Sequence, residues 1–313
     1  MKRCLYCYQL LDDESLNYHS SCSKKFFGTT VAPLLEYNNN EIAQLGLKVV
    51  SSKIAVTGVQ AKLSLHIDTG YSPKRFTIVG LWGEYILKPQ TEHSRKLPEV
   101  EDLTMHLAQL AKIPTVQHAL IPLKDGSLAY ITKRADRDKV RKIAMEDMCQ
   151  LTEHLTEYKY KGSYEQIAKT ILKYSANPVL DEVRFYEQLL FSFLTGNADM
   201  HLKNFSLIKD DAQGFVLMPA YDMVATTLVN KMDKEELALT LNAKKRKLRR
   251  EDFIISFSHN EINTKQIDRI FSGFAKIIPT WFEFISISFL PEDMKLEYID
   301  LIKDRANRLK IEY

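Results

Sequence analysis

Four side chains able to take part in proton or phosphate chemistry lie within the stretch 196–205, GNADMHLKNF. They are Asp199, His201, Lys203 and Asn204, and an apolar run precedes them. An aspartate followed five residues later by an asparagine has the spacing of a kinase catalytic loop. There the aspartate accepts the substrate proton and the asparagine holds Mg²⁺. The stretch therefore predicts a phosphoryl-transfer site, for which other segments must supply the remaining parts.

A second carboxylate is expected beside this loop. Asp222 ends the stretch 219–222 (PAYD), which follows two short strand-like segments, 205–208 and 215–218. A hairpin made by these segments would bring Asp222 back to Asn204, giving a carboxylate and an amide oxygen that suit Mg²⁺. A turn or a helix cap is the alternative role for Asp222.

The first half of the chain offers a cation for the phosphates. Lys88 ends an apolar strand-like segment, and a lysine that points inward there is costly unless it meets an anion. Glu101, on the next predicted helix, is expected to pair with Lys88, with Glu99 as the alternative. The stretch 57–62 (TGVQAK) is expected to cover the phosphates, although it holds only one glycine.

Four residues of metal-ligand type occur near the amino terminus, as Cys4, Cys7, His19 and Cys22. Three thiolates and one imidazole would close a tetrahedral zinc shell, and such a site would be structural because it leaves no open position. The alternative is a short cap with reduced cysteines and a surface histidine. Cys149 lies far away and is expected to be a small buried hydrophobe.

The composition is that of an ordinary globular protein, with 313 residues, 45% hydrophobic and 27% charged residues, and a net charge of +3. That charge is too small to indicate a nucleic-acid coat or a membrane-surface protein. No stretch approaches the ~18 apolar residues of a membrane span, and the first residues turn acidic too early for a secretory signal. We therefore expect a cytoplasmic protein, in which the cysteines are thiols or metal ligands.

Hydrophobic periodicity divides the chain into a β-rich half and a helical half. Strands are expected at 54–56, 62–67, 76–79, 85–87, 115–123, 127–132, 205–208 and 215–218. Helices are expected at 41–47, 99–112, 145–155, 163–174, 181–194, 265–276 and 291–310. This order predicts an α+β, two-lobed fold with lobes at 1–134 and 135–313, and a ligand cleft between the lobes.

Six motifs in this order resemble the HipA family of bacterial toxin serine/threonine kinases, whose fold is protein-kinase-like. The motifs are TGVQAKLSL, YILKP, LPEVEDLTMHLA, MEDMCQL, GNADMHLKNFSL and PAYDM. They extend over most of residues 50–225. The chain resembles the short, HipT-like form, which lacks the additional amino-terminal subdomain of the longer HipA proteins.

The resemblance implies that ATP is bound by residues of both halves. Lys88 would contact the phosphates, with Glu101 as its partner, and the backbone from Lys133 to Ala135 would meet the adenine. Either Lys244 or Lys245 would reach the nucleotide, and the choice between them stays open. The phosphate-covering loop would include Thr57, Gly58, Val59 and Gln60.

The resemblance also implies the catalytic roles. Asp199 would be the catalytic base, His201 and Lys203 would shape the loop, and Asn204 and Asp222 would bind Mg²⁺.

The family regulates itself through a serine just before the phosphate loop, whose autophosphorylation ejects the loop. Here the matching stretch is 55–57 (AVT), so Thr57 is the expected acceptor, ahead of Ser51, Ser52 and Ser64. At the hinge, Lys133 and Ala135 replace an acidic and an aromatic residue of the long form.

The resemblance implies several partners. The substrate would be a translation component such as an aminoacyl-tRNA synthetase, and an antitoxin would bind the chain. A separate small protein would replace the missing subdomain, and DNA would be contacted only through the antitoxin. Delivery of the chain into another cell stays open.

Three other functions are open at this point. Asp199, His201 and Asn204 form a D-x-H-x2-N pattern that also resembles the catalytic loop of phosphoinositide kinases. The run 244–250 (KKRKLRR) could contact nucleic acid, although Glu251 and Asp252 follow it and no aromatic residue interrupts it. A pseudokinase scaffold is disfavoured because all the charged and metal-binding positions are present.

Overall fold

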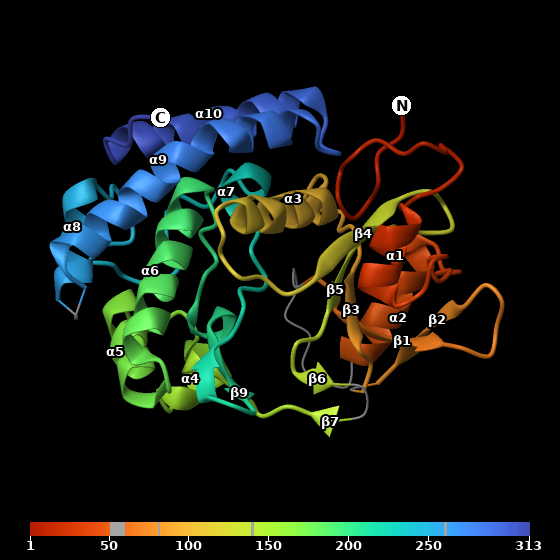
Figure 1. Ribbon diagram of the computed structural model, residues 1–313, viewed down its shortest axis with the longest axis horizontal. Coiled ribbons are helices and arrows are strands. Elements are labelled where there is room, and N and C mark those ends of the chain that lie inside the picture. The colour runs from red at the N-terminus through yellow and green to blue at the C-terminus, as the bar shows by residue number, and fades with distance from the viewer. Residues whose placement is uncertain (51–59, 81, 139–140, 260–261) are drawn as a thin grey trace. The chain divides into compact units, whose positions relative to one another are not determined.

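The computed structural model describes residues 1–50, 60–80, 82–138, 141–259 and 262–313 (Figure 1). The chain divides into two compact units. Unit 1 comprises Met1–Asp102 and Val116–Lys139, and unit 2 comprises Leu103–Thr115 and Val140–Tyr313. The division falls within helix α3 (Leu97–Leu110), so a single cut in the sequence does not describe it. The expected lobes, 1–134 and 135–313, stay a prediction.

Unit 1 is built on one antiparallel sheet of five strands in the order β2-β1-β3-β5-β4. The strands agree with the expected segments to within a few residues, while the strand expected at 54–56 lies outside the described residues. The central strand β3 is bonded to β1 on one side and β5 on the other, with Lys88 opposite Tyr130. The strands are β1 (Leu63–Asp68), β2 (Arg75–Val79), β3 (Tyr85–Lys88), β4 (His118–Pro122) and β5 (Leu128–Lys133), and a short β6 (Arg137–Asp138) follows.

Aromatic side chains join the first helix to this sheet. Helix α1 (Ser20–Phe27), which the sequence analysis did not anticipate, buries Phe26 and Phe27. Their rings lie 5.7 and 6.3 Å from the ring of Tyr85, and Phe27 also packs edge-on against Phe76 at 5.8 Å. Such edge-to-face contacts add to the free energy gained by burying the rings. Helix α2 (Asn39–Val50) follows α1 in the chain.

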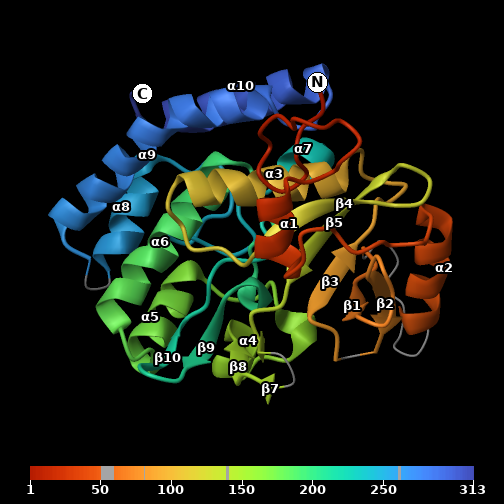
Figure 2. The ribbon, with the colours of Figure 1, turned by 45° about the vertical axis from the view of Figure 1, so that its right-hand side comes forward.

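Unit 2 is mostly helical, and α5 and α6 run side by side in it (Figure 2). Helix α6 begins with Pro178 in its first turn, where a missing N–H costs nothing, and it is expected from the sequence only from residue 181. The helices are α4 (Met148–Leu151), α5 (Tyr164–Tyr174), α6 (Pro178–Leu194), α7 (Thr226–Val229), α8 (Arg250–Ser258), α9 (Thr264–Ser286) and α10 (Glu292–Arg308), with short 3₁₀ turns η1 (Thr156–Tyr158) and η2 (Leu202–Asn204).

The helix expected at 145–155 is wrong at both ends, because helix occurs only at Met148–Leu151. Met145–Asp147 forms strand β8, which pairs with β9 (Ser206–Asp210), and β9 pairs in turn with β10 (Gly214–Leu217). Asp147 then caps α4 through a reciprocal capping box with Gln150. Pairing with a strand about 60 residues away overrides the local helical pattern here.

The carboxyl-terminal helices differ from expectation in length. Helix α9 continues for ten residues past the predicted end at 276 and contains Pro279. The apolar face that includes Phe274, Ile278 and Trp281 is buried along it, and this burial compensates for the hydrogen bond that the proline removes. The remaining strand, β7 (Arg141–Lys142), is short.

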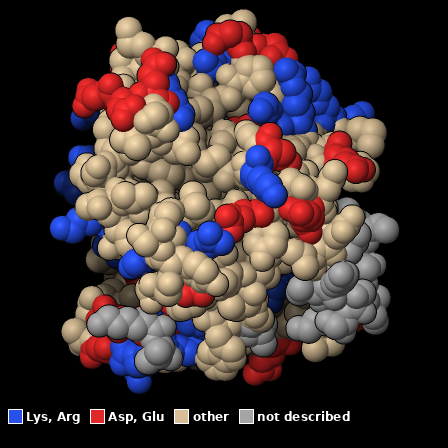
Figure 3. All heavy atoms as spheres, turned by 90° about the vertical axis from the view of Figure 1, so that its right-hand side faces the viewer, with Lys and Arg blue, Asp and Glu red and all other residues tan. Residues whose placement is uncertain are grey.

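Charged side chains of both signs are distributed over the surface. On the face shown in Figure 3, basic and acidic side chains both occur and uncharged surface interrupts them. The basic run 244–250 is partly neutralised, because Lys244 pairs with Asp252 at 2.7 Å and Lys245 with Glu235 at 3.4 Å. These pairs weaken the case for nucleic-acid binding. Among the described residues, no helix combines the length and the apolar character that crossing a bilayer requires.

The core of unit 2 supplies a test of the fold. Trp281 is fully buried, donates to the carbonyl of Leu107 at 2.9 Å, and packs against Phe191. Trp281→Ala should lower the free energy of unfolding by about 3–5 kcal/mol, as measured by urea denaturation. Trp82, the other tryptophan of the chain, is 73% exposed. Trp82→Ala is the matched control, and equal losses for both variants would contradict the placement of Trp281.

Candidate active site

The predicted catalytic loop follows α6 directly. Gly196 has φ 69°, and a Cβ atom there would lie 2.6 Å from the Leu301 side chain and 3.2 Å from that of Thr227. Only glycine meets both conditions without strain, so Gly196 ends the helix and starts the loop. The carbonyl of Gly196 accepts from the backbone N–H of Thr227 at 3.0 Å, which fixes the start of the loop against α7.

The structure brings Asp199 and Asn204 together. The side-chain Nδ2 of Asn204 donates to the backbone carbonyl of Asp199 at 2.8 Å, so the amide closes the loop between them. Asn204 is buried, whereas Asp199 is half-buried. With Nδ2 engaged, the amide oxygen of Asn204 is its remaining ligand atom, and oxygen is what Mg²⁺ requires.

A tyrosine covers the carboxylate of Asp199, and sequence reasoning missed it. The hydroxyl of Tyr160 donates to Asp199 Oδ1 at 2.7 Å, across 39 residues of sequence. Burial and the charge of Asp199 raise the pKa of Tyr160, which therefore stays a hydrogen-bond donor at neutral pH. No local pattern identifies Tyr160, because its place depends on the turn that follows η1.

His201 lies inside the loop as a neutral imidazole. Burial lowers its pKa, although the carboxylates of Asp199 and Asp222 act in the opposite direction. Its ring packs edge-on against Tyr160 at 5.0 Å. Its position thus suits the shaping role expected of it, since a buried neutral ring supports the loop by packing.

Lys203 is held by a carboxylate that the sequence analysis did not connect with it. Its Nζ lies 2.7 Å from Asp147 Oδ2, the residue that caps α4. The carbonyl of Lys203 accepts from the hydroxyl of Tyr221 at 2.8 Å, and that hydroxyl also contacts Ser206 Oγ at 2.6 Å. The loop is therefore fixed from two sides.

Asp222 follows Tyr221 and lies beside the loop. The preceding Ala220 donates to the carbonyl of Pro114 at 2.7 Å, which holds this segment in place. Asp222 has φ 58°, a left-handed conformation that aspartate tolerates better than most residues. Its carboxylate is close enough to His201 to act on the pKa of the ring. Asp199 and Asn204 are thus joined by a hydrogen bond within unit 2, and the charge of Asp222 acts on His201 of the same loop.

In unit 1, Lys88 and Glu101 form a buried ion pair. Lys88 is 4% exposed and Glu101 is fully buried, and Lys88 Nζ bonds to Glu101 Oε1. The ammonium also lies 5.3 Å from the ring centre of Tyr130 on β5. The alternative partner, Glu99, pairs instead with Lys96 at 2.8 Å. Removing two charges from water is costly, and a close contact of this kind offsets part of that cost.

The predicted phosphate loop is described only at its end. Thr57, Gly58 and Val59 lie outside the described residues. The side-chain amide of Gln60 donates to the carbonyl of Pro89 at 2.8 Å. Pro89 directly follows Lys88, so Gln60 lies near the end of β3.

The predicted hinge leads into a compact charged cluster. The N–H of Lys133 donates to the carbonyl of Gln117 at 2.8 Å, so that donor is engaged within unit 1. After Ala135, Asp136 accepts from Arg134 at 2.7–2.9 Å and lies beside Arg137. Burial acts to raise the pKa of Asp136, but the bond from Arg134 and the two guanidinium charges outweigh it and lower the pKa.

Lys244 and Lys245 occupy a tight turn. Leu241 and Lys244 exchange backbone hydrogen bonds of 2.8 and 2.9 Å, and Asn242 and Ala243 between them have φ 46° and 60°. Two such residues define a hairpin turn of type I′. The ion pairs of the two lysines do not distinguish which of them would reach a nucleotide.

The four amino-terminal ligand-type residues are also gathered. Ligand atoms of Cys4, Cys7, His19 and Cys22 all lie within 4.8 Å of one another. Cys149 is buried and far from them in the sequence, as a small core residue.

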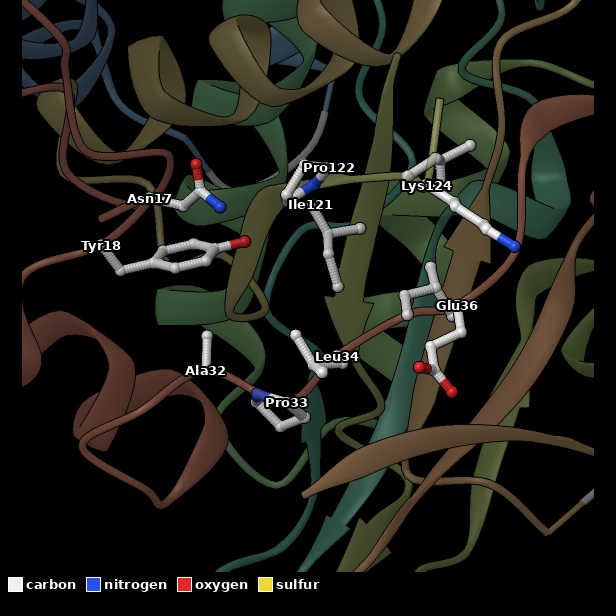
Figure 4. Close-up of a pocket in the computed structure, with 11 residues that line it drawn as sticks. Asn17, Tyr18, Ala32, Pro33, Leu34, Glu36, Ile121, Pro122 and Lys124 are labelled. Carbon is white, nitrogen blue, oxygen red and sulfur yellow. The ribbon is translucent and has the colours of Figure 1, made fainter. Parts of the chain in front are cut away.

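A separate pocket of about 660 Å³ lies in unit 1 (Figure 4). Its lining includes Tyr18, Leu34, Ile121 and Lys124 and contains none of the predicted site residues. This pocket therefore adds nothing to the phosphoryl-transfer hypothesis.

The chain belongs to the HipA-like C-terminal domain family, whose model matches residues 54–282, well over half of the sequence. It is 30% identical over 186 residues to a putative kinase of Haemophilus influenzae, covering 56% of this chain and 53% of the relative. It is 30% identical over 187 residues to the putative kinase Y4dM of Sinorhizobium fredii, covering 56% and 45%. The chain thus spans about half the length of the curated relatives it matches.

Two solved structures share its fold. A Shewanella oneidensis HipA, solved with HipB and operator DNA, matches with a TM-score of 0.70 at 22% identity, over 82% of this chain and 65% of that one. The Helicobacter pylori proinflammatory kinase CtkA matches with a TM-score of 0.53 at 14% identity, over 72% and 87%. These likenesses confirm the predicted α+β, protein-kinase-like fold.

The buried ion pair gives a prediction that does not depend on activity. Lys88→Met should cost about 3–5 kcal/mol of unfolding free energy, because the buried Glu101 carboxylate loses its ammonium partner. The double variant Lys88→Met/Glu101→Leu should recover much of that loss in urea denaturation.

An exposed pair is the control. Lys231 and Glu297 lie 2.7 Å apart with side chains 70% and 41% exposed, so Lys231→Met should cost less than about 1 kcal/mol. Lys88 and Glu101 would not be coupled if the double variant lost as much free energy of unfolding as Lys88→Met and Glu101→Leu lose together.

Proposed function

We propose that the chain is an ATP- and Mg²⁺-dependent protein serine/threonine kinase. Family membership and the relatives named putative kinases support a kinase. The observation that carries the proposal is the hydrogen bond from the Asn204 side-chain amide to the Asp199 carbonyl, which joins the two residues of the predicted D-x4-N loop. Phosphoryl transfer asks mainly for such placed charges.

Each residue has a definite role in this proposal. Asp199 orients the substrate hydroxyl and accepts its proton, while Asn204 and Asp222 supply oxygen ligands to Mg²⁺, whose charge offsets that of the phosphates. Lys88 binds the α- and β-phosphates, and Glu101 keeps its ammonium in position. His201 and Lys203 hold the loop.

The contacts to the adenine and the other contacts to the phosphates are proposed from the resemblance to the family. The backbone of Lys133 and Ala135 would meet the adenine, Gln60 and its neighbours Thr57, Gly58 and Val59 would cover the phosphates, and Lys244 or Lys245 would reach the nucleotide.

The partners belong to the same proposal. The solved Shewanella oneidensis complex contains HipA, HipB and operator DNA. By analogy, this chain would bind an antitoxin and meet DNA through it. An aminoacyl-tRNA synthetase is the proposed class of substrate, and the HipT-like organisation would add a small protein partner.

Carboxylate variants test the mechanism. Asp199→Ala or Asp222→Ala should lower phosphoryl transfer at least ~10²-fold, measured with labelled ATP, Mg²⁺ and a bacterial lysate. Asparagine tolerates the left-handed backbone at position 222. Asp222→Asn therefore removes the charge without adding the backbone strain that alanine would bring.

The matched control is Asp211→Ala, which removes an exposed carboxylate that pairs with Arg141. Near-normal phosphoryl transfer by both Asp199→Ala and Asp222→Ala would contradict the proposed mechanism. A parallel assay on phosphoinositide vesicles distinguishes a lipid kinase, since labelled lipid in place of labelled protein would change the substrate class.

Autophosphorylation is expected at Thr57. Ser64, a competing acceptor, already accepts from the N–H of Gly83 at 3.0 Å and is half-buried, which disfavours it. Phosphopeptide mapping after incubation with ATP should place the phosphate on Thr57, and Thr57→Val should abolish it while removing little volume. Phosphate on Ser51, Ser52 or Ser64 in the parent chain would reject this assignment.

A further inference from the structure

The amino-terminal cluster lies outside the residues 54–282 that match the family, so family membership assigns it no role. Cys4 and Cys7 come from the first loop, His19 precedes α1, and Cys22 lies in its first turn. His19 Nδ1 is 3.4 Å from Cys7 Sγ and 3.7 Å from Cys22 Sγ. Ligand atoms around a tetrahedral zinc, with Zn–S of about 2.3 Å, are separated by about 3.5–3.8 Å. The cluster already has nearly that size.

The imidazole of His19 is oriented for a cation. Its Nε2 lies 2.9 Å from the carbonyl of Leu10, so Nε2 carries the proton and donates it to that oxygen. The lone pair of Nδ1 then faces the sulfur atoms. Metal-binding histidines are commonly fixed in this way by a backbone carbonyl on the far ring nitrogen.

The backbone around the first two cysteines brings their side chains close together. Residues 3–10 form a tight hairpin, in which Cys4 donates to the carbonyl of Gln9 at 2.9 Å and Tyr8 has φ 63°. The N–H of Tyr8 returns to the carbonyl of Cys4 at 2.9 Å, so Cys4 and Cys7 lie on one tight turn.

The segment 3–22 holds two phenols against the rest of unit 1. Tyr8 donates to Asp102 Oδ2 at 2.8 Å, directly after Glu101, and Asp102 Oδ1 contacts His118 at 2.7 Å. Tyr18 donates to the carbonyl of Leu120 at 2.6 Å. A ligand that holds this segment in place would therefore also stabilise its contacts to β4 and α3.

We propose that Cys4, Cys7, His19 and Cys22 bind one Zn²⁺ in a closed structural site that anchors residues 3–22 to β4 and α3. Three thiolates and one imidazole suit zinc, and four protein ligands leave no position for a substrate. A disulfide would use two of the three sulfurs and would leave the third thiol and the oriented Nδ1 without a shared ligand.

Metal content tests the site on the intact chain. The purified protein should contain about one zinc per chain, and Co²⁺ exchanged into it should show tetrahedral d–d bands with thiolate charge transfer. Cys7→Ser and His19→Ala should lose most of the metal, whereas Cys149→Ala, the fourth cysteine, should retain it.

Several results would overturn the proposal. These are absence of metal after incubation with Zn²⁺ or Co²⁺, full metal content in both ligand variants, or a disulfide among these cysteines in the mass of the untreated chain.

Thermal stability tests the anchoring role. A chelator should lower the Tm of the parent chain but not that of Cys7→Ser, which has no metal to lose. Tyr8→Phe should keep its zinc while losing the bond to Asp102, so its Tm should fall without chelator. A parent Tm that does not respond to complete zinc removal would reject the anchoring role. Neither measurement involves phosphoryl transfer, so failure here leaves the proposed kinase activity untouched.

Discussion

One ion pair withdrawn from water constrains unit 1. Lys88 ends the central strand β3, Glu101 lies on α3, and neither side chain reaches solvent to an appreciable extent. Separating them would leave two buried charges, which costs far more free energy than an exposed pair could return. The sheet order, with β1 and β5 on either side of β3, and the ring of Tyr130 keep the lysine where the helix can meet it. The architecture of unit 1 therefore maintains a cation in a fixed position, which is the property that a phosphate-binding lysine needs.

Unit 2 reaches a comparable rigidity by another route. Its loop after α6 is polar and irregular, so it cannot be held by a repeating ladder of backbone bonds. Individual side chains replace that ladder: Asn204 bonds to the Asp199 carbonyl, Lys203 to Asp147, and Tyr221 to the Lys203 carbonyl. Because each bond has one donor and one acceptor in a fixed place, the carboxylate of Asp199 is positioned by several independent restraints.

The sequence predicts those parts of this arrangement that depend on local pattern. Short segments rich in β-forming residues locate β1, β2, β3 and β5, helical spacing locates α3, α5 and α6, and the D-x4-N spacing predicts Asp199 and Asn204 as site residues. Contacts between distant residues escape such reasoning. The pairing of Met145–Asp147 with β9, the bond from Tyr160 to Asp199 and the bond from Lys203 to Asp147 join residues 39 or more positions apart. No periodicity encodes them, because they arise only once the units have folded.

Tyr160 has a consequence for which molecules can use Asp199. Its hydroxyl already occupies Oδ1, and it belongs to the same chain, so its effective concentration at that carboxylate is far above that of a dissolved alcohol. Under the proposed mechanism, a substrate hydroxyl that binds Oδ1 would have to compete with it. A small free molecule has only its own hydroxyl with which to win this competition, whereas a large partner can draw on binding free energy from contacts elsewhere. In the proposed kinase, the tyrosine would therefore favour macromolecular hydroxyl donors over small molecules.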